Sequence, residues 1–174
     1  MRIAVISDTH FPARGRVLPE NCRERLIDAD VILHGGDHCD SEALGSLQQL
    51  GPPIISVHGN VDDARVRSQL PREVTFDADG TRIAMVHDAG PAAGRMARLR
   101  QQCPDAVVVV FGHSHIPLIE RAEDGFMILN PGSPTDRRRQ PVHTMAELIL
   151  SPGQPARAVI IRLDGPGGTP NEND

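Results

Sequence analysis

The sequence predicts an α/β domain in which two packed, mixed β-sheets are flanked by helices. Three observations favour this fold. Five hydrophobic runs are short, rich in Val and Ile and not amphipathic, which is typical of strands buried on both faces. These runs alternate with segments of helical spacing in the first half of the chain. Strand pairs joined by turn residues follow in the second half, and two sheets packed face to face with helices outside accommodate this order.

The first half of the chain supplies three strands and the first helix. The strands are expected at three hydrophobic runs, residues 2–7, 31–34 and 54–58. A helix is expected over residues 19–29, because Cys22, Leu26 and Ala29 recur there at helical spacing.

Three further helices are indicated by their end signals. Ser41 is the expected N-cap of one helix, which Gly51 ends. A short helix begins near Asp62 and ends before Pro71. The last helix spans residues 91–102 and opens with a proline, which is favourable in a first helical turn.

The remaining hydrophobic runs form hairpins around one further buried strand. Asp79-Gly80 is a strong hairpin signal between residues 74–78 and 81–87. The buried strand follows at residues 106–111. Two more hairpins are expected, 116–121 with 126–130 and 145–150 with 157–163.

Length and composition predict one ordinary globular domain. The 174 residues suffice for one full hydrophobic core, and we assign the domain to residues 1–163. Residues 164–174 contain Gly, Pro and acidic residues with nothing to bury, so we expect a disordered tail. No apolar run approaches membrane-spanning length and no signal-peptide pattern is visible, so we expect a cytoplasmic location without membrane partners. Three cysteines without CxxC spacing suit reduced thiols.

Charge and aromatic content argue against nucleic-acid binding. The formal net charge is −5, which gives no general attraction to polyanions. Trp and Tyr are absent, and the chain has only four Phe residues that could stack on bases. We therefore expect a small-molecule ligand, and the sequence leaves open whether the chain forms a homo-oligomer.

Candidate metal ligands stand where hydrophobic runs end. Seven residues in five clusters do so, namely Asp8, His10, Asp37, Asn60, His87, His113 and His115. In layered α/β proteins ligands bind at the carboxyl ends of the strands, so five such ends can meet in one cleft. The pattern is typical of a two-metal hydrolase, because a random distribution of His and Asp would not follow strand ends.

Six motifs resemble, in order and spacing, those of the calcineurin-like metallophosphoesterases. They are Asp8-Thr9-His10, Gly36-Asp37, Gly59-Asn60, His87, Gly112-His113-Ser114-His115 and Asn130-Pro131-Gly132-Ser133. Each motif alone is weak, but their shared order makes chance implausible. The resemblance covers about residues 1–163 and is strongest to the small single-domain bacterial and archaeal phosphodiesterases, so it implies the sandwich fold of that family.

The resemblance also implies two metal sites that share one carboxylate. The first would be held by residues matching Asp8, His10, Asp37 and His115. The second would be held by residues matching Asp37, Asn60, His87 and His113. Such mixed carboxylate, imidazole and amide ligands suit Mn²⁺, Fe, Co²⁺, Ni²⁺ or Zn²⁺ better than Ca²⁺, and Mn²⁺ is our first choice.

The activity implied is that of a phosphodiesterase in which a hydroxide shared by the two metals attacks phosphorus. The resemblance assigns catalytic roles to Asp37, Asn60 and His113. The sequence contains no GxSxG, P-loop or dinucleotide-binding motif that would indicate another mechanism. One alternative is a phosphomonoesterase acting on a nucleotide, a sugar phosphate or a phosphoprotein. Another is a scaffold, because the eukaryotic retromer contains a subunit of this fold that works mainly as one.

For several histidines and one asparagine, a purely structural role is the alternative to a role at the metal site. His87 ends a buried strand, where a core histidine would look the same. Asn60 after a glycine also suits a turn. His34 and His58 precede glycines at strand ends, where orienting a ligand and plain packing are equally good interpretations. His38 is expected to point away from the metals.

A basic loop and two departures from the family pattern bear on the substrate. Arg137, Arg138 and Arg139 are candidate substrate-binding residues, since guanidinium matches phosphate geometry, although a solvated loop explains them equally well. Val61 stands where many relatives have a histidine that protonates the leaving group, so the acid is unassigned and Asp62 is the nearest substitute. Asp88-Ala89 replaces the Gly-His that often follows His87 in relatives.

Overall fold

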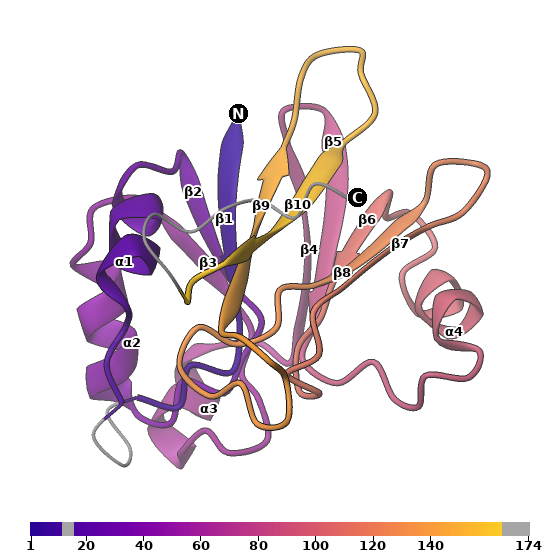
Figure 1. The fold of residues 1–174 in the computed structure, drawn as a ribbon. Helices are drawn as coiled ribbons and strands as arrows, with labels where there is room; N and C mark the ends of the chain where they lie inside the picture. The colour runs from indigo at the N-terminus through magenta and orange to yellow at the C-terminus, as the bar shows by residue number, and fades with distance from the viewer. Residues whose placement is uncertain (12–15, 165–174) are drawn as a thin grey trace.

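The computed structural model describes residues 1–11 and 16–164, which form two five-stranded sheets packed face to face (Figure 1). In the first sheet the order is β10 (Arg157–Arg162), β9 (Thr144–Ile149), β1 (Arg2–Ile6), β2 (Val31–His34) and β3 (Ile54–Ser56). In the second it is β4 (Glu73–Ala78), β5 (Thr81–Val86), β6 (Val108–Val110), β8 (Met127–Asn130) and β7 (Leu118–Arg121). The predicted two-sheet α/β fold is confirmed.

Both sheets are mixed: the first is antiparallel at one edge only, and the second is antiparallel at both edges. In the first sheet β1, β2 and β3 run parallel, whereas β9 pairs antiparallel with β1 and with β10. In the second, β5, β6 and β8 run parallel, whereas β4 and β7 pair antiparallel with their neighbours. The carboxyl ends of the parallel strands lie at the same end of the sandwich, at the bottom of Figure 1.

The strands are hydrophobic on both faces because each sheet is covered on both sides. In β1, Ile3 and Val5 pack into the core between the sheets, while Ala4 and Ile6 pack toward the helices. The helices on that side are α1 (Glu20–Ile27) and α2 (Ser41–Gln48), and α4 (Arg95–Gln102) covers the other sheet (Figure 1). The fourth helix, α3 (Ala64–Gln69), lies at the bottom end of the sandwich.

Two helix starts differ from the sequence prediction. Asp40, not Ser41, caps α2, and its carboxylate accepts the N–H of Ala43 at 2.9 Å. Helix α4 begins at Arg95 after Gly94, which has a φ of 71°. The segment before it is a loop, in which the Arg98 side chain donates to the carbonyl oxygen of Ala89 at 2.7 Å.

Other boundaries agree within two residues. The hairpin at Asp79-Gly80 forms as predicted, with φ values of 47° and 77° that suit a tight turn. At the C-terminal boundary the Asp164 carboxylate accepts the backbone N–H of His143 at 2.9 Å. Residues 165–174, the rest of the predicted tail, lie outside the described residues. None of the helices described is long and apolar enough to cross a membrane.

Candidate metal centre

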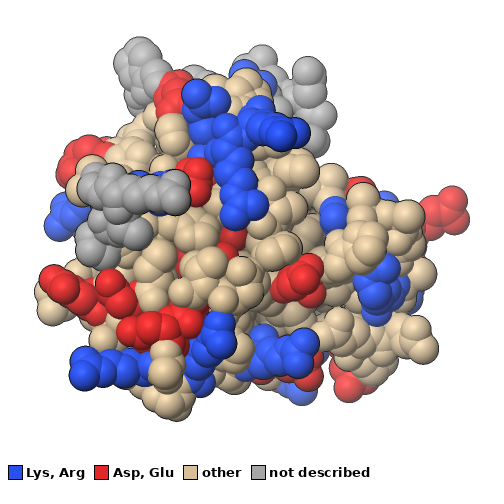
Figure 2. Space-filling view, turned by 90° about the horizontal axis from the view of Figure 1, so that it is seen from below, with Lys and Arg blue, Asp and Glu red and all other residues tan. Residues whose placement is uncertain are grey.

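Loops at the carboxyl ends of five parallel strands bring the seven predicted ligands together. The loops after β1, β2 and β3 carry Asp8, His10, Asp37 and Asn60, and the ends of β5 and β6 carry His87, His113 and His115. Figure 2 views this end of the molecule: basic side chains gather on its upper part, and acidic and basic side chains alternate along its lower part. The area between them is mostly uncharged.

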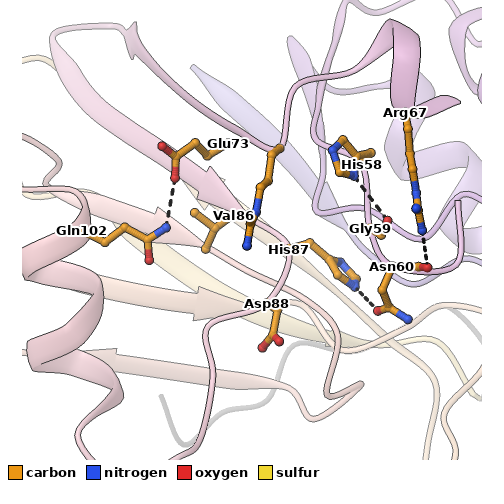
Figure 3. Close-up of a pocket in the computed structure, with 10 residues that line it drawn as sticks. His58, Gly59, Asn60, Arg67, Glu73, Val86, His87, Asp88 and Gln102 are labelled. Atoms are coloured by element: carbon orange, nitrogen blue, oxygen red, sulfur yellow. Dashed lines mark hydrogen bonds between the residues drawn. The ribbon is translucent and has the colours of Figure 1, made fainter. Parts of the chain in front are cut away.

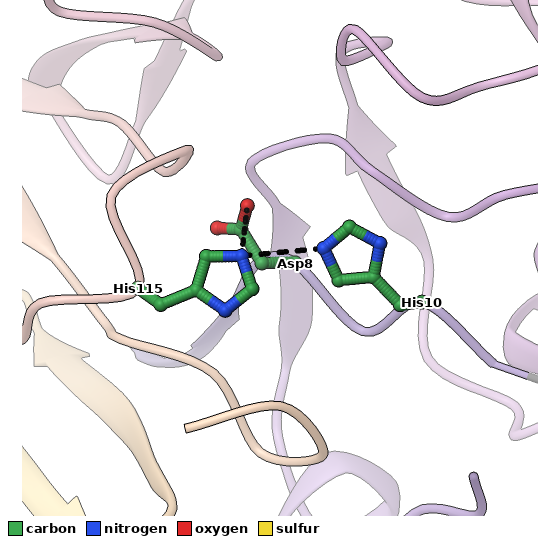
Figure 4. A group of neighbouring side chains, drawn as sticks. All are labelled: Asp8, His10 and His115. Carbon is green, nitrogen blue, oxygen red and sulfur yellow. Dashed lines mark hydrogen bonds and ion pairs between the residues drawn. The ribbon is translucent and has the colours of Figure 1, made fainter. Parts of the chain in front are cut away.

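The first ligand group consists of Asp8, His10 and His115, whose donor atoms all lie within 4.8 Å of one another (Figure 4). The two Nε2 atoms of His10 and His115 are 3.2 Å apart. His115 Nε2 is also 3.4 Å from Asp8 Oδ1. Asp8 and His10 come from the first sheet and His115 from the second, so this group spans the sandwich.

The second group consists of Asp37, His87 and His113, again with donor atoms within 4.8 Å. Asn60 completes it, because its Oδ1 lies 3.0 Å from His87 Nε2 and 2.8 Å from His113 Nδ1. This group also takes residues from both sheets.

Asp37 lies between the two groups. Its Oδ2 is 3.7 Å from His10 Nε2, and its Oδ1 is 3.4 Å from His87 Nε2. One carboxylate thus offers an oxygen to each group, which is the geometry required of a residue that bridges two cations.

The backbone at five of these residues is in the left-handed region. The φ values are 56° at Asp8, 46° at His10, 61° at Asp37, 66° at His113 and 58° at His115. Residues other than glycine rarely adopt such angles, and each costs on the order of 1 kcal/mol or more. Their concentration in the ligand loops makes this end of the sandwich the candidate functional site.

Backbone carbonyls fix the ring orientation of two histidines. His87 Nδ1 donates to Gly35 O at 2.8 Å, and His115 Nδ1 donates to Asp136 O. The contact at Nδ1 turns Nε2 of each ring toward its ligand group. Histidines held in this way are oriented for a cation.

The charge states of the groups are coupled. Burial raises the pKa of Asp8 to about 7. Burial acts in the same direction on Asp37, but the hydrogen bond and charge of His87 outweigh it and hold that pKa at about 2. For His87 burial is opposed by Asp37 and Asp8, which raise its pKa to about 9. A cation binding here must displace protons from Asp8 and His87, so its affinity should rise with pH.

Burial also lowers the pKa of His115 to about 4 and lowers that of His10. Both rings are therefore neutral near pH 7 and present lone pairs rather than charges. The donor set, two carboxylates with neutral imidazoles and an amide oxygen, fits a divalent transition metal.

Glycines in the motifs leave room for the ligands. A Cβ at Gly59 would lie 2.0 Å from Asp37 Oδ1, and a Cβ at Gly112 would lie 1.9 Å from Ser7 Oγ and 2.7 Å from Asp8 Oδ2. These close approaches explain why glycine precedes Asn60 and His113.

Asp62 has a role that the sequence prediction missed. Its side chain is only 3 % exposed. Its Oδ2 accepts the N–H groups of Gly59 at 2.6 Å and Asp37 at 3.2 Å, and its Oδ1 accepts that of Cys39 at 2.8 Å. Asp62 therefore ties two ligand loops together and is not available as an acid for the leaving group. The pairing of a carboxylate with distant backbone N–H groups leaves no signal in the sequence.

The Asn130-Pro-Gly-Ser133 motif supports the ligand loops, as expected. Asn130 Nδ2 donates to Gly112 O at 2.8 Å, and Ser133 Oγ donates to Asp8 O at 2.8 Å. Neither side chain belongs to the two ligand groups.

The other histidines near the loops have structural contacts. His34 Nε2 lies 3.1 Å from Thr9 Oγ1, while His34 Nδ1 accepts the N–H of Gly36 at 3.1 Å. The ring stacks on His38, with 3.6 Å between centroids. His38 is turned away from the ligand groups, as expected, and its Nε2 lies 2.7 Å from Ser56 Oγ. His34 thus orders the loop that carries Asp37.

The basic loop lies beside the first group. Arg137, Arg138 and Arg139 are all exposed. The charge of Arg138 contributes to the lowered pKa values of both His10 and His115, which indicates that it lies near them.

A family model of the calcineurin-like phosphoesterase superfamily domain matches residues 1–151. The chain belongs to this superfamily. A relative in Methanothermobacter thermautotrophicus named "Probable metallophosphoesterase" is 35% identical over 168 residues, covering 95% of each chain. A protein of Methanocaldococcus jannaschii named a phosphodiesterase is 24% identical over 148 residues, covering 76% of this chain and 83% of the relative.

Solved structures share the fold of this superfamily member. Vps29 of Entamoeba histolytica, described as complexed with Zn²⁺, superposes with a TM-score of 0.81 at 22% identity. The match covers 98% of this chain and 97% of Vps29. An archaeal phosphodiesterase matches with a TM-score of 0.69 at 20% identity, covering 92% of this chain and 99% of that one.

Proposed function

We propose that this calcineurin-like phosphoesterase is a two-metal phosphodiesterase. The observation that carries the proposal is the position of Asp37 between two ligand groups, each built from both sheets. Membership of the superfamily and the phosphodiesterase name of one relative support the same reaction.

Asp8, His10 and His115 would hold one ion, Asn60, His87 and His113 the other, and Asp37 would bridge them. Two bound divalent ions would supply an activated water and would neutralise phosphoryl oxygens. We take Mn²⁺ as the first ion to test, with Fe, Co²⁺, Ni²⁺ and Zn²⁺ as alternatives.

The chain's own residues hold and orient the site. Asp37, Asn60 and His113 are the proposed catalytic residues because they meet where both groups join: Asn60 Oδ1 lies 2.8 Å from His113 Nδ1, and donor atoms of Asp37 and His113 lie within 4.8 Å of each other. Cys39, beside His10, is a poor nucleophile because burial raises the pKa of its thiol to about 11. A protein nucleophile is therefore not required by this geometry.

The basic loop of Arg137, Arg138 and Arg139 is proposed to bind a remote part of the substrate. Its exposure near the first group suits a contact with an anionic ester. If so, replacing the three arginines by alanine should raise KM more than it lowers kcat, because uniform binding is lost. Unchanged kinetics would assign the triplet to a solvated loop.

Hydrolysis, rather than metal binding, distinguishes this proposal from a scaffold role. A Vps29 structure with the same fold is described as complexed with Zn²⁺, so metal content alone does not separate the two. We expect activity on bis(4-nitrophenyl) phosphate to vanish on chelation and to return with Mn²⁺. It should fall by orders of magnitude in folded Asp8→Asn and His113→Ala variants.

A panel of esters decides between phosphodiesterase and phosphomonoesterase. Faster turnover of monoesters such as 4-nitrophenyl phosphate would favour the second, and no metal-dependent hydrolysis of any ester would favour the scaffold. We also place the protein in the cytoplasm as a proposal, which fractionation of the source cells would test.

A further inference from the structure

A polar cavity of about 270 Å³ lies directly beside the second ligand group (Figure 3). Asn60 and His87 form part of its wall, so the cavity opens from the site itself. The rest of the wall is dominated by polar side chains from α3, β4, α4 and the loops between them, namely His58, Arg67, Arg72, Glu73, Asp88 and Gln102.

The charged side chains of this wall differ in the hydrogen bonds that they make. Glu73 Oε2 accepts from Gln102 Nε2 at 3.0 Å, and Asp88 Oδ1 accepts the N–H of Gly90 at 2.7 Å. Arg67 Nη2 donates to Asn60 O at 2.6 Å. Arg72 makes no hydrogen bond or ion pair with any residue that the structure describes. Two arginines and two carboxylates line the wall, so its formal charges balance, and among the described residues Arg72 is the lining arginine without a partner that an anion would have to displace.

We propose that this cavity binds a second phosphate group of the substrate and that Arg72 selects it. The inference rests on the proposed function, in which the first phosphate lies at the ligand groups. A guanidinium presents a planar fork of N–H donors that matches phosphate oxygens. Arg72 is thus suited to a dianionic group at a fixed separation from the reacting ester.

The size and the remaining lining support a sugar phosphate as the non-reacting part. A volume of about 270 Å³ lies just below the range of ligand pockets, about 300–1,000 Å³, so the cavity suits a small group such as a sugar phosphate. Glu73 and Gln102 retain oxygen acceptors for hydroxyl groups. Asp88, one of the two departures from the family pattern, lines the same cavity, so substrate selection is expected to differ here from relatives.

A matched pair of chromogenic diesters tests the proposal. The probes are thymidine 5′-(4-nitrophenyl phosphate) with and without a 3′-phosphate, hydrolysed by the Mn²⁺-loaded protein. We expect KM to be about 10-fold lower for the 3′-phosphorylated ester, because Arg72 would add charge-assisted hydrogen bonds to the extra phosphate. Arg72→Ala should abolish this preference, and Arg72→Lys should keep part of it.

Arg65→Ala is the matched control. Arg65 is an exposed arginine of α3, the helix that precedes Arg72 in the chain, and it does not line the cavity. It should leave the preference unchanged. Arg67 is less suitable for the test, because its contact with Asn60 O would couple its loss to the ligand group.

Binding gives a readout that does not depend on turnover. By titration calorimetry, thymidine 3′,5′-bisphosphate should bind the Mn²⁺-loaded protein about 10-fold more tightly than thymidine 5′-phosphate, and Arg72→Ala should remove the difference. Equal binding of the two nucleotides, or an equal preference in the Arg72→Ala variant, overturns the inference. Absence of hydrolysis of both esters by the wild type contradicts the proposed function instead, and the calorimetry still decides on the cavity.

Discussion

Asp62 shows how one buried carboxylate organises the metal centre. It accepts three backbone N–H groups from the loops that carry Asp37 and Asn60. In Asp62→Asn, an amide NH₂ must replace one of the accepting oxygens, so at least one buried N–H loses its partner. We expect a loss of about 1–3 kcal/mol in the free energy of unfolding together with weaker metal binding, measured by urea denaturation and elemental analysis.

The adjacent Asp63 provides the control. Its Oδ1 accepts the N–H of Val66 at 2.8 Å as the N-cap of α3. Because Asn caps helices about as well as Asp, Asp63→Asn should change stability and metal content little. Equal effects of the two substitutions would contradict the role assigned to Asp62.

Occupancy of the two ligand groups should respond differently to single substitutions. Asp37 faces both groups, so Asp37→Asn should lower the metal content of both, whereas His87→Ala should mainly empty the second. Elemental analysis of purified, Mn²⁺-loaded protein measures this. Wild-type protein that never holds more than one equivalent would contradict a two-metal centre.

The valine at position 61 leads to a prediction about how the rate of hydrolysis depends on the leaving group. The side chain is 44 % exposed and its N–H donates to Asp37 Oδ1 at 3.0 Å, so position 61 lies beside the ligand groups but outside the core. With valine there and Asp62 bound to backbone, no proton donor is evident. Aryl diesters should therefore be cleaved much faster than alkyl diesters, and Val61→His should speed alkyl cleavage more, because general acid help is worth about 10²–10⁴-fold.

The dependence of the wild-type rate on leaving-group pKa measures this. A flat dependence would show that another residue already supplies the proton. In that case Val61→His should give no selective gain for alkyl esters.

At this scale the sequence motifs were sufficient to predict which seven side chains meet. They were not sufficient for the contacts that orient them. Gly35 O and Asp136 O hold two of the histidines, and a carbonyl oxygen is present at every position of a chain. The left-handed φ at His10 or Asp37 is likewise a result of loop closure, which the residue type does not indicate.

Among the elements, the loop after β3 has no space for a side chain at Gly59. A Cβ at Gly59 would lie 2.0 Å from Asp37 Oδ1 and 2.5 Å from Asp37 N, so Gly59→Ala must displace the bridging carboxylate or its loop. We expect a loss of metal from both groups and a lower melting temperature. Thermal unfolding and elemental analysis test both expectations.

Gly45 is the matched glycine for comparison. It lies within α2, and a Cβ there would meet nothing within 4 Å. Gly45→Ala should raise the free energy of unfolding by about 0.5–1 kcal/mol, because alanine favours helix. If Gly59→Ala were equally harmless, the close approach to Asp37 would not limit the site.

Element ends were harder to predict than elements. Asp40 and Ser41 are adjacent and both can cap a helix, so composition does not choose between them; the structure uses Asp40. Helix α4 begins four residues after Pro91, directly after Gly94, whose left-handed φ of 71° is not indicated by the proline signal.

For the whole molecule, buried histidines predict a loss of stability in acid. His34 is fully buried, and burial, followed by the charge of His38, lowers its pKa well below 6.5. Below pH 6.5 the unfolded chain protonates this ring while the folded one does not, so unfolding takes up a proton. The free energy of unfolding should therefore fall by about 1.4 kcal/mol per pH unit from this group as pH drops below 6.5, with no contribution above it.

The variant His34→Asn removes this proton uptake. Urea unfolding of wild type and variant between pH 7 and pH 5 should show a shallower slope in the variant, by about one proton. Identical slopes would mean that His34 titrates alike in the folded and unfolded chain.

The arrangement of the sheets follows only partly from sequence. Short Val- and Ile-rich runs predicted buried strands, and Asp79-Gly80 predicted a hairpin, both correctly. The insertion of β6 between β5 and β8 was not predictable, because runs such as 106–111 and 126–130 have the same apolar character and fit neighbouring places in a sheet equally well.

Each ligand group contains residues from both sheets, so a bound ion would link the two sheets at the end of the sandwich that carries the ligand loops. This link would be lost whenever the ion dissociates. Its contribution would depend on the chemical potential of the metal rather than on sequence: a concentration 100 times the dissociation constant adds about 2.7 kcal/mol to the folded state. The concentration of available metal would then determine the stability of the contact between the two sheets at that end, while apolar packing stabilises the contact at the opposite end. In a cell poor in the ion, the ligand loops of the same chain would be less stable, and proteases would cleave them more readily than the rest of the protein.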